Sequence, residues 1–253
     1  MRLRTPHGAA FAPPEAWWRL PVGALLVGLL AAYYAAAESL PSFTLWGDVA
    51  WLGLVLMPAA FALVGLALPV EQALHSQRLA WAVAVLGAAT AVLALAGLDV
   101  AANFAKLAAV ALAGFWFLHF FEAVSWIVLV ALLIIPVDIY SVARGPTKKI
   151  TESQPQVFDA LSISFPIPGE HNAAELGLPD VLFFSLFLAA AQRFGLRLGW
   201  TWVATALSFG TTLALAMAFD VTGLPALPLL SVAFVAVNAD RLWAAYRARG
   251  GIV

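Results

Sequence analysis

The chain has 253 residues, of which 63% are apolar and only 11% are charged, and its mean hydropathy is +0.93. A soluble domain carries about a quarter charged residues, so this chain has too little polar surface to cover a water-soluble globule. The net charge of −1 gives no basis for binding nucleic acid, and the lack of cysteine excludes disulfides, thiol catalysis and thiolate metal sites. Composition therefore predicts an integral membrane protein in contact with the lipid bilayer.

Hydropathy predicts an all-α fold, a polytopic transmembrane bundle of about eight spans. A span needs roughly 20 predominantly apolar residues. The qualifying segments are residues 19–37, 49–70, 79–98, 102–119, 122–143, 180–196, 199–219 and 224–242. The sixth of them is short for a span. We expect one membrane domain, composed of an N-terminal bundle (1–143), an extramembrane loop (144–178) and a C-terminal bundle (179–253).

The first segment has an alternative interpretation. Arg2 and Arg4 precede its apolar run, and three alanines at 35–37 precede Glu38, as in a cleavable signal peptide. The apolar run is long for the core of a signal peptide, which favours a retained membrane helix.

The long loop contains a segment with alternating polarity. Residues 160–166 alternate apolar and polar side chains, a period typical of a strand. The segment is either a short β-strand at the membrane edge or an amphipathic stretch at the interface.

Two of the fourteen carboxylates stand out by position. Most others lie in polar breaks or at span ends, where we expect Glu71 to be solvated and Asp48 to reach the interface. Asp138 is the only charge in residues 128–142, and Asp180 opens the sixth span. An ionisable group inside a span is costly and therefore marks a functional site by default.

Helical rise predicts one depth for the two aspartates. Asp138 lies six residues before Arg144, about 9 Å along a helix, and Asp180 lies five residues after Glu175, about 7.5 Å. The loop joins both helix ends on one membrane side, so the carboxylates can face each other. Two close carboxylates that share a proton can activate water. Catalysis, proton or ion transport, and a structural role for a buried acid all remain open at this point.

A proline-rich segment returns to the same membrane side. Pro225 and Pro228 lie three residues apart where the last helix starts. Most such prolines only begin a helix. Its predicted place beside both aspartates makes the segment a candidate part of their site.

Three elements in order resemble the presenilin and signal-peptide-peptidase superfamily of intramembrane aspartyl proteases. The first is an aspartate late in a span followed by a basic Gly-Pro turn, at 137–146. The second is Leu-Gly-Leu-Pro-Asp at 176–180, similar to the family's Leu-Gly-x-Gly-Asp. The third is Pro-Ala-Leu at 225–227. The resemblance covers residues 117 to 253, about half of the chain, and the Pro-Ala-Leu element distinguishes it from prepilin peptidases.

The resemblance implies a presenilin-like fold and an aspartic endopeptidase that cleaves transmembrane segments of other membrane proteins. Asp138 and Asp180 would be the catalytic pair, and no metal or other cofactor would be needed. The substrate helix would unwind and add as a strand beside the site, which satisfies its backbone hydrogen bonds. Residues that would bind substrate or shape the site are Gly177, Leu178, Pro179, Pro225, Ala226, Leu227 and Tyr140.

The chain also departs from the family pattern. Val137 stands where tyrosine usually precedes the first aspartate, Pro179 stands where glycine usually precedes the second, and eight spans replace the usual nine. The alternatives are a non-proteolytic homologue that binds membrane helices and a proton- or cation-coupled transporter that uses the acid pair. Nothing in the sequence indicates accessory subunits.

The basic residues predict an orientation. With eight spans both termini share one side, which carries nine basic residues against four on the other, so the positive-inside rule places both termini in the cytoplasm. The four are Lys106, Arg144, Lys148 and Lys149. Richness in alanine and arginine points to a prokaryotic cell membrane.

Overall fold

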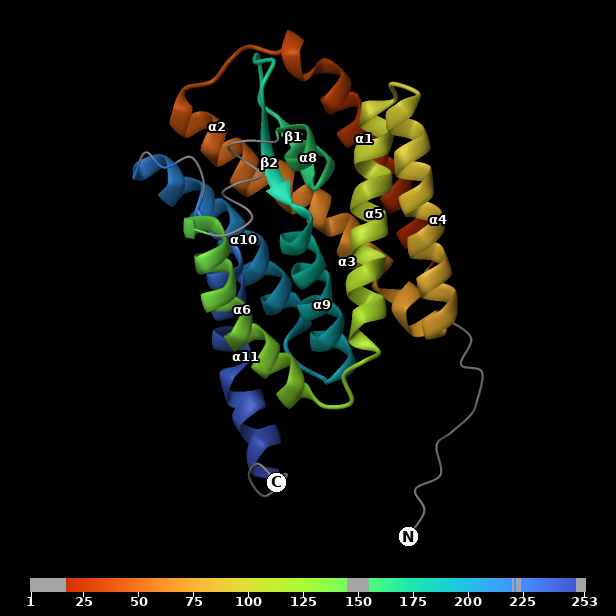
Figure 1. Ribbon diagram of the computed structural model, residues 1–253, viewed down its shortest axis with the longest axis vertical. Coiled ribbons are helices and arrows are strands. Elements are labelled where there is room, and N and C mark those ends of the chain that lie inside the picture. Colours follow the sequence, from red (N-terminus) through yellow and green to blue (C-terminus); the bar gives the residue numbers. More distant parts are fainter. Residues whose placement is uncertain (1–16, 145–154, 220, 222–223, 249–253) are drawn as a thin grey trace.

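The computed structural model describes residues 17–144, 155–219, 221 and 224–248, and it is mostly helical. Figure 1 shows the long helices running roughly along one axis as a bundle. The helices are α1 (Arg19–Ala36), α2 (Leu45–Trp51), α3 (Met57–Ala73), α4 (Ser76–Leu95), α5 (Asp99–Leu118), α6 (Val124–Arg144), α8 (Pro155–Ala160), α9 (Leu178–Arg193), α10 (Leu198–Ala218) and α11 (Leu227–Ala248). A 3-10 turn, η2 (Ala37–Ser39), follows α1, and a π-helical segment, η3 (Leu52–Leu56), joins α2 to α3.

A helix stands within a few residues of each of the eight predicted segments. Among the described residues, seven helices are long and apolar enough to cross a membrane. The exception is α9, which with 16 residues extends only about 24 Å and falls short of a full crossing. The helical membrane bundle is confirmed, while the count of spanning helices is seven by this measure and not eight.

Helix α9 is the centre of the bundle. Its sequence is apolar on all sides, as a fully surrounded helix requires, and every residue from Phe184 to Ala191 is buried. Phe61 of α3 stacks on Phe184 with ring centroids 4.4 Å apart, and Phe234 of α11 stacks on Phe187 at 4.5 Å. These ring stacks hold the helix that carries Asp180 between two others.

The long loop contains a β-hairpin. Strand β1 (Ser162–Pro166) pairs antiparallel with β2 (Ala173–Gly177), with Ser162 opposite Gly177. Ile163 and Phe165 are buried in the main core and Ser162 is buried as well, so the alternating segment is a β-strand, one of its two open interpretations. Strand β2 continues directly into α9, and Figure 1 shows the hairpin standing above the start of that helix.

The π-helical segment lies where two helices cross closely. A Cβ added to Gly53 would stand 2.7 Å from Cα of Gly210, so only glycine lets η3 and α10 approach this far. Lower down, the indole N–H of Trp202 donates to the carbonyl of Phe61 at 3.2 Å. The first half of the chain is thereby joined to the C-terminal helices.

Two carboxylates near the limits of predicted spans are buried, and for Glu71 the expectation of a solvated side chain is therefore wrong. Glu71 is only 7% exposed, because α3 continues through it to Ala73, and the side chains of His119 and Arg193 lie within electrostatic range of it. Asp48 is 8% exposed, because α2 begins at Leu45 and places Asp48 in its first turn against the bundle.

Candidate active site

Asp180 is the third residue of α9. Gly177 is the N-cap of this helix, and its backbone N–H donates a hydrogen bond back to the Asp180 carboxylate. An acidic side chain at this position that binds the N-cap N–H is one half of a capping box. The contact fixes the carboxylate above the start of α9, at the positive end of the helix dipole.

The sequence around Asp180 explains this local geometry. Pro179 occupies the second helical position, where its missing N–H would have no intrahelical partner in any case. The N–H of Leu178 donates to the carbonyl of Leu161 at 2.9 Å, which extends the hairpin by one pair. Leu178 therefore starts α9 with its N–H already occupied, so this group cannot pair with a substrate segment.

Asp138 lies on the inner side of α6, two residues after Pro136. Its Oδ2 accepts a hydrogen bond from the backbone N–H of Leu227 at 3.2 Å. Leu227 is the first residue of α11, so this N–H has no partner within its own helix. The predicted juxtaposition of Asp138 with the Pro-Ala-Leu segment is thus found, and a helix N-terminus is a favourable place for a negative charge.

The two carboxylates share one region of the bundle. Asp180 lies in the first turn of α9, Asp138 lies late in α6 and contacts the N-terminus of α11, and the charge of Asp138 is within electrostatic range of Asp180. Both residues are half-buried among the protein's own atoms. The structure thus places two acidic side chains from α6 and α9 in one part of the bundle.

Helical rise, which predicted a common depth for Asp138 and Asp180, is only partly the right reason. Glu175 lies in β2 and not in a helix, so the chain from Glu175 to Asp180 is strand for its first part and helix for the rest. The aspartates meet because α6, α9 and α11 pack together, and equal counts of helical residues do not explain it.

The other predicted site residues divide into two groups. Ala226 and Leu227 are buried beside Asp138, Pro225 is half-buried, and Gly177 contacts Asp180, while Pro179 is exposed next to it. Tyr140 is 65% exposed, because two residues along a helix place it on the face opposite to Asp138. The Gly-Pro turn at 145–146, Lys148 and Lys149 lie outside the described residues.

A cluster of polar side chains that the sequence interpretation overlooked, of which Asn103 is buried, lies on the far side of the hairpin. Tyr33 and Tyr34 of α1 and Asn103 and Lys106 of α5 all hydrogen-bond to the backbone of β1 or of the residues just before it. Asn103 lies in the predicted span 102–119, where an amide must find a partner. The need for a hydrogen-bond partner could have identified Asn103 from the sequence.

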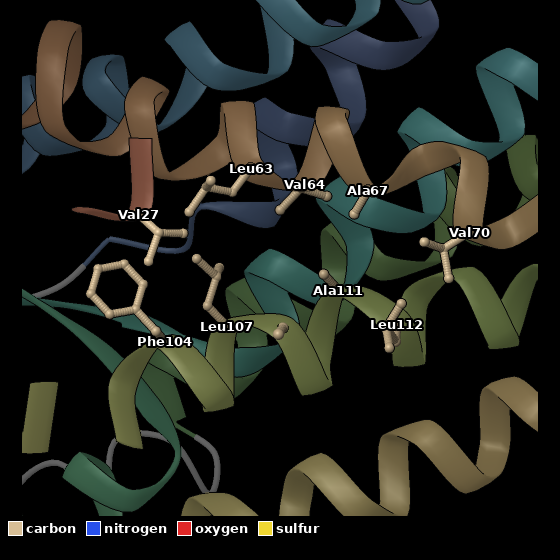
Figure 2. Close-up of a pocket in the computed structure, with 10 residues that line it drawn as sticks. Val27, Leu63, Val64, Ala67, Val70, Phe104, Leu107, Ala111 and Leu112 are labelled. Carbon is tan, nitrogen blue, oxygen red and sulfur yellow. The ribbon is translucent and has the colours of Figure 1, made fainter. Parts of the chain in front are cut away.

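An apolar cavity lies elsewhere in the bundle. Figure 2 shows side chains of α1, α3 and α5 around it, and the lining contains no polar side chain. Such a lining offers nothing to hold a proton or a water. Within the described ranges, no three His, Asp or Glu residues come together as a metal site would require.

The fold and hydropathy define the class of protein, an integral membrane protein built as a helical bundle. Neither the protein-family models nor the curated proteins contain a match to the chain. The arrangement of its own residues must therefore support any assignment of function.

Proposed function

We propose that the protein is an intramembrane aspartyl endopeptidase of the presenilin-like type, which hydrolyses peptide bonds in transmembrane segments of other proteins. The observation that carries the proposal is the pairing of Asp138 and Asp180 at two adjoining helix N-termini. Water-activating hydrolysis requires two acids that can share one proton, and two neighbouring aspartates in a membrane bundle supply these side chains.

The chemistry needs only the two side chains and water. The ionised carboxylate takes a proton from water while the water oxygen attacks the carbonyl carbon of the scissile bond. The protonated carboxyl gives its proton to the carbonyl oxygen, and a later proton transfer to the amide nitrogen releases the amine product. Each turnover consumes one water and leaves the pair with one shared proton.

The outer edge of β2, which has no backbone partner among the described residues, supports a peptide as substrate. In the register of the hairpin, residues 173, 175 and 177 direct their backbone groups away from β1. An unwound substrate segment can add to this edge as a third strand. The edge ends at Gly177, three residues before Asp180, so a segment paired along it would be led to the aspartates.

One observation favours binding without cleavage. The hydrogen bond from Gly177 to Asp180 is a helix cap that would stabilise α9 even in a protein with no catalytic activity. A presenilin-like protein that binds membrane helices but does not cut them is therefore the second candidate.

Cleavage of a purified transmembrane helix in detergent tests the proposal. Wild-type protein should release two products, located by mass spectrometry, whereas Asp138→Asn and Asp180→Asn should each lose about 1,000-fold or more in kcat. Because the carboxylates act as a unit, the double variant should lose little more than either single one.

Two results would decide against the protease. Substantial turnover by either folded aspartate variant would remove the pair from the mechanism. Binding of the helix without any product from wild type would leave the non-proteolytic candidate.

A further inference from the structure

A two-stranded hairpin has two outer edges, and either can accept an extended peptide. In this register the N–H of Leu178 donates to the carbonyl of Leu161, and the N–H of Ile167 donates to the carbonyl of Asn172. Between these two pairs, residue pairs that hydrogen-bond to each other alternate with pairs that do not. Ser162, Ser164 and Pro166 therefore direct their backbone groups outward from β1. An extended segment could bind there as well as along β2.

The outer edge of β1 is closed by four side chains. The amide of Asn103 donates to the carbonyl of Ser164 at 3.0 Å and accepts from its N–H at 3.1 Å, as a neighbouring strand would. The Tyr34 hydroxyl donates to the same carbonyl at 2.7 Å. Asn103 is only 8% exposed, so these bonds form away from water.

The same closure continues at both ends of β1. The Tyr33 hydroxyl donates to the carbonyl of Pro166 at 2.7 Å, and Pro166 has no N–H to offer. The Lys106 ammonium donates to the carbonyl of Ser162 at 2.7 Å and to that of Asp159 at 2.9 Å. We call Tyr33, Tyr34, Asn103 and Lys106 the edge clamp.

The outer edge of β2 has no such cover in the part of the chain that the structure describes. The N–H of Gly177 is used by Asp180, while the outward backbone groups of Ala173 and Glu175 have no described partner. The hairpin is thus held to α1 and α5 through β1, while the outer edge of β2 remains available to an added strand.

We propose that the edge clamp is a positioning device for substrate. By closing β1 it leaves β2 as the one edge on which a segment can add, and by fixing the hairpin to α1 and α5 it sets the register of that segment relative to Asp180. This role rests on the proposed peptidase function. Asn103 is its central residue, because it alone supplies both a donor and an acceptor to one residue of β1.

The test compares Asn103→Leu with Asn172→Leu, which makes the same change at an exposed residue between the two strands. Tyr34→Phe is a milder variant that removes one hydroxyl and keeps the ring beside Phe104. Two readouts apply to each folded protein: hydrogen exchange of the Ser164 amide, and the positions of cleavage in a helical substrate.

We expect the Ser164 amide of Asn103→Leu to exchange at least about tenfold faster, while the amide of Leu176, which bonds inside the hairpin, stays protected. Cleavage should spread to bonds on either side of the wild-type position and fall about tenfold in rate, with a smaller effect in Tyr34→Phe. Asn172→Leu should match wild type in both readouts.

A purely stabilising clamp would lower the melting temperature without moving the cleavage position. Unchanged cleavage positions in folded Asn103→Leu would therefore overturn the proposal, as would unchanged exchange at Ser164. If wild type cleaves nothing, the peptidase function fails separately, and the exchange measurement still decides whether the clamp holds β1.

Discussion

The backbone N–H of Leu227 donates to Oδ2 of Asp138 at 3.2 Å, joining residues that are 89 apart in the chain. Leu227 follows Pro225 and Ala226 at the start of α11, where the backbone N–H groups have no acceptor within the helix. On α9, Asp180 takes up an N–H in the same way from Gly177. Each aspartate thus accepts an N–H at one helix N-terminus, and the packing of α6, α9 and α11 brings the charge of Asp138 within electrostatic range of Asp180.

Activity should follow a bell-shaped pH profile. A pair that works with one shared proton is inactive when both members are protonated and again when both are ionised. We expect kcat to fall about tenfold per pH unit on the outer part of each limb. Cleavage rates measured between about pH 4 and 9, with the fold followed by circular dichroism, give the profile. A level profile over that range with an intact fold would argue against a shared proton.

Gly177→Ala should reduce activity through the position of Asp180. An added Cβ would stand 3.2 Å from Oδ2 of Asp180, so the carboxylate must move by a few tenths of an ångström. Displacing a catalytic group on this scale should lower kcat about three- to tenfold. Gly199→Ala is the control, because a Cβ there meets nothing within 4 Å. Equal turnover of both variants would show that this contact does not set the reacting geometry.

Pro179→Gly should raise turnover severalfold on a generic transmembrane substrate. The exposed pyrrolidine ring stands beside Gly177 and Asp180 and would hinder close approach of a substrate backbone, which glycine permits. The variant should also lose about 0.5–1 kcal/mol of unfolding free energy, because glycine has more freedom in the unfolded chain. Pro179→Ala, which keeps a Cβ, should show a smaller increase in turnover than Pro179→Gly. If Pro179→Gly and wild type cleave equally well, Pro179 serves only to start α9.

The hairpin side of the bundle should face outward from the cytoplasm. Six described arginines lie at the end of the bundle where α1 begins and α11 finishes: Arg19, Arg78, Arg193, Arg197, Arg241 and Arg247. Lys106 and Arg144 lie toward the other end, so positive-inside places the hairpin outside. An impermeant thiol reagent on intact cells should label Glu170→Cys, and it should label Arg247→Cys only after permeabilisation. The opposite pattern would invert the orientation.

Much of the architecture was accessible from hydropathy. Eight apolar segments predicted eight helices to within a few residues, because a helix is the form in which an apolar segment satisfies its own backbone in lipid. The strand at residues 160–166 was one of two open interpretations, since alternation is shared by strands and interfacial stretches. Its partner β2, with the sequence Ala-Ala-Glu-Leu-Gly, has no comparable pattern and was not foreseen.

The errors have a common physical cause. Glu71 was expected near water because charges usually end a span, yet α3 extends past the predicted limit and carries Glu71 inward. Tyr140 was grouped with the site by sequence proximity, although two residues on a helix turn a side chain to the far face. Local sequence does not report which neighbours will cover a helix face.

The sequence by itself determined that this is a helical membrane protein with aspartates late in one helix and early in another, because hydropathy and the scarcity of charge act locally along the chain. Only the tertiary structure decided that Asp138 meets the start of α11, that α9 is a short central helix, and that Asn103 closes β1. These relations join residues that are far apart in the chain, and they depend on how the helices pack rather than on any single segment's preference.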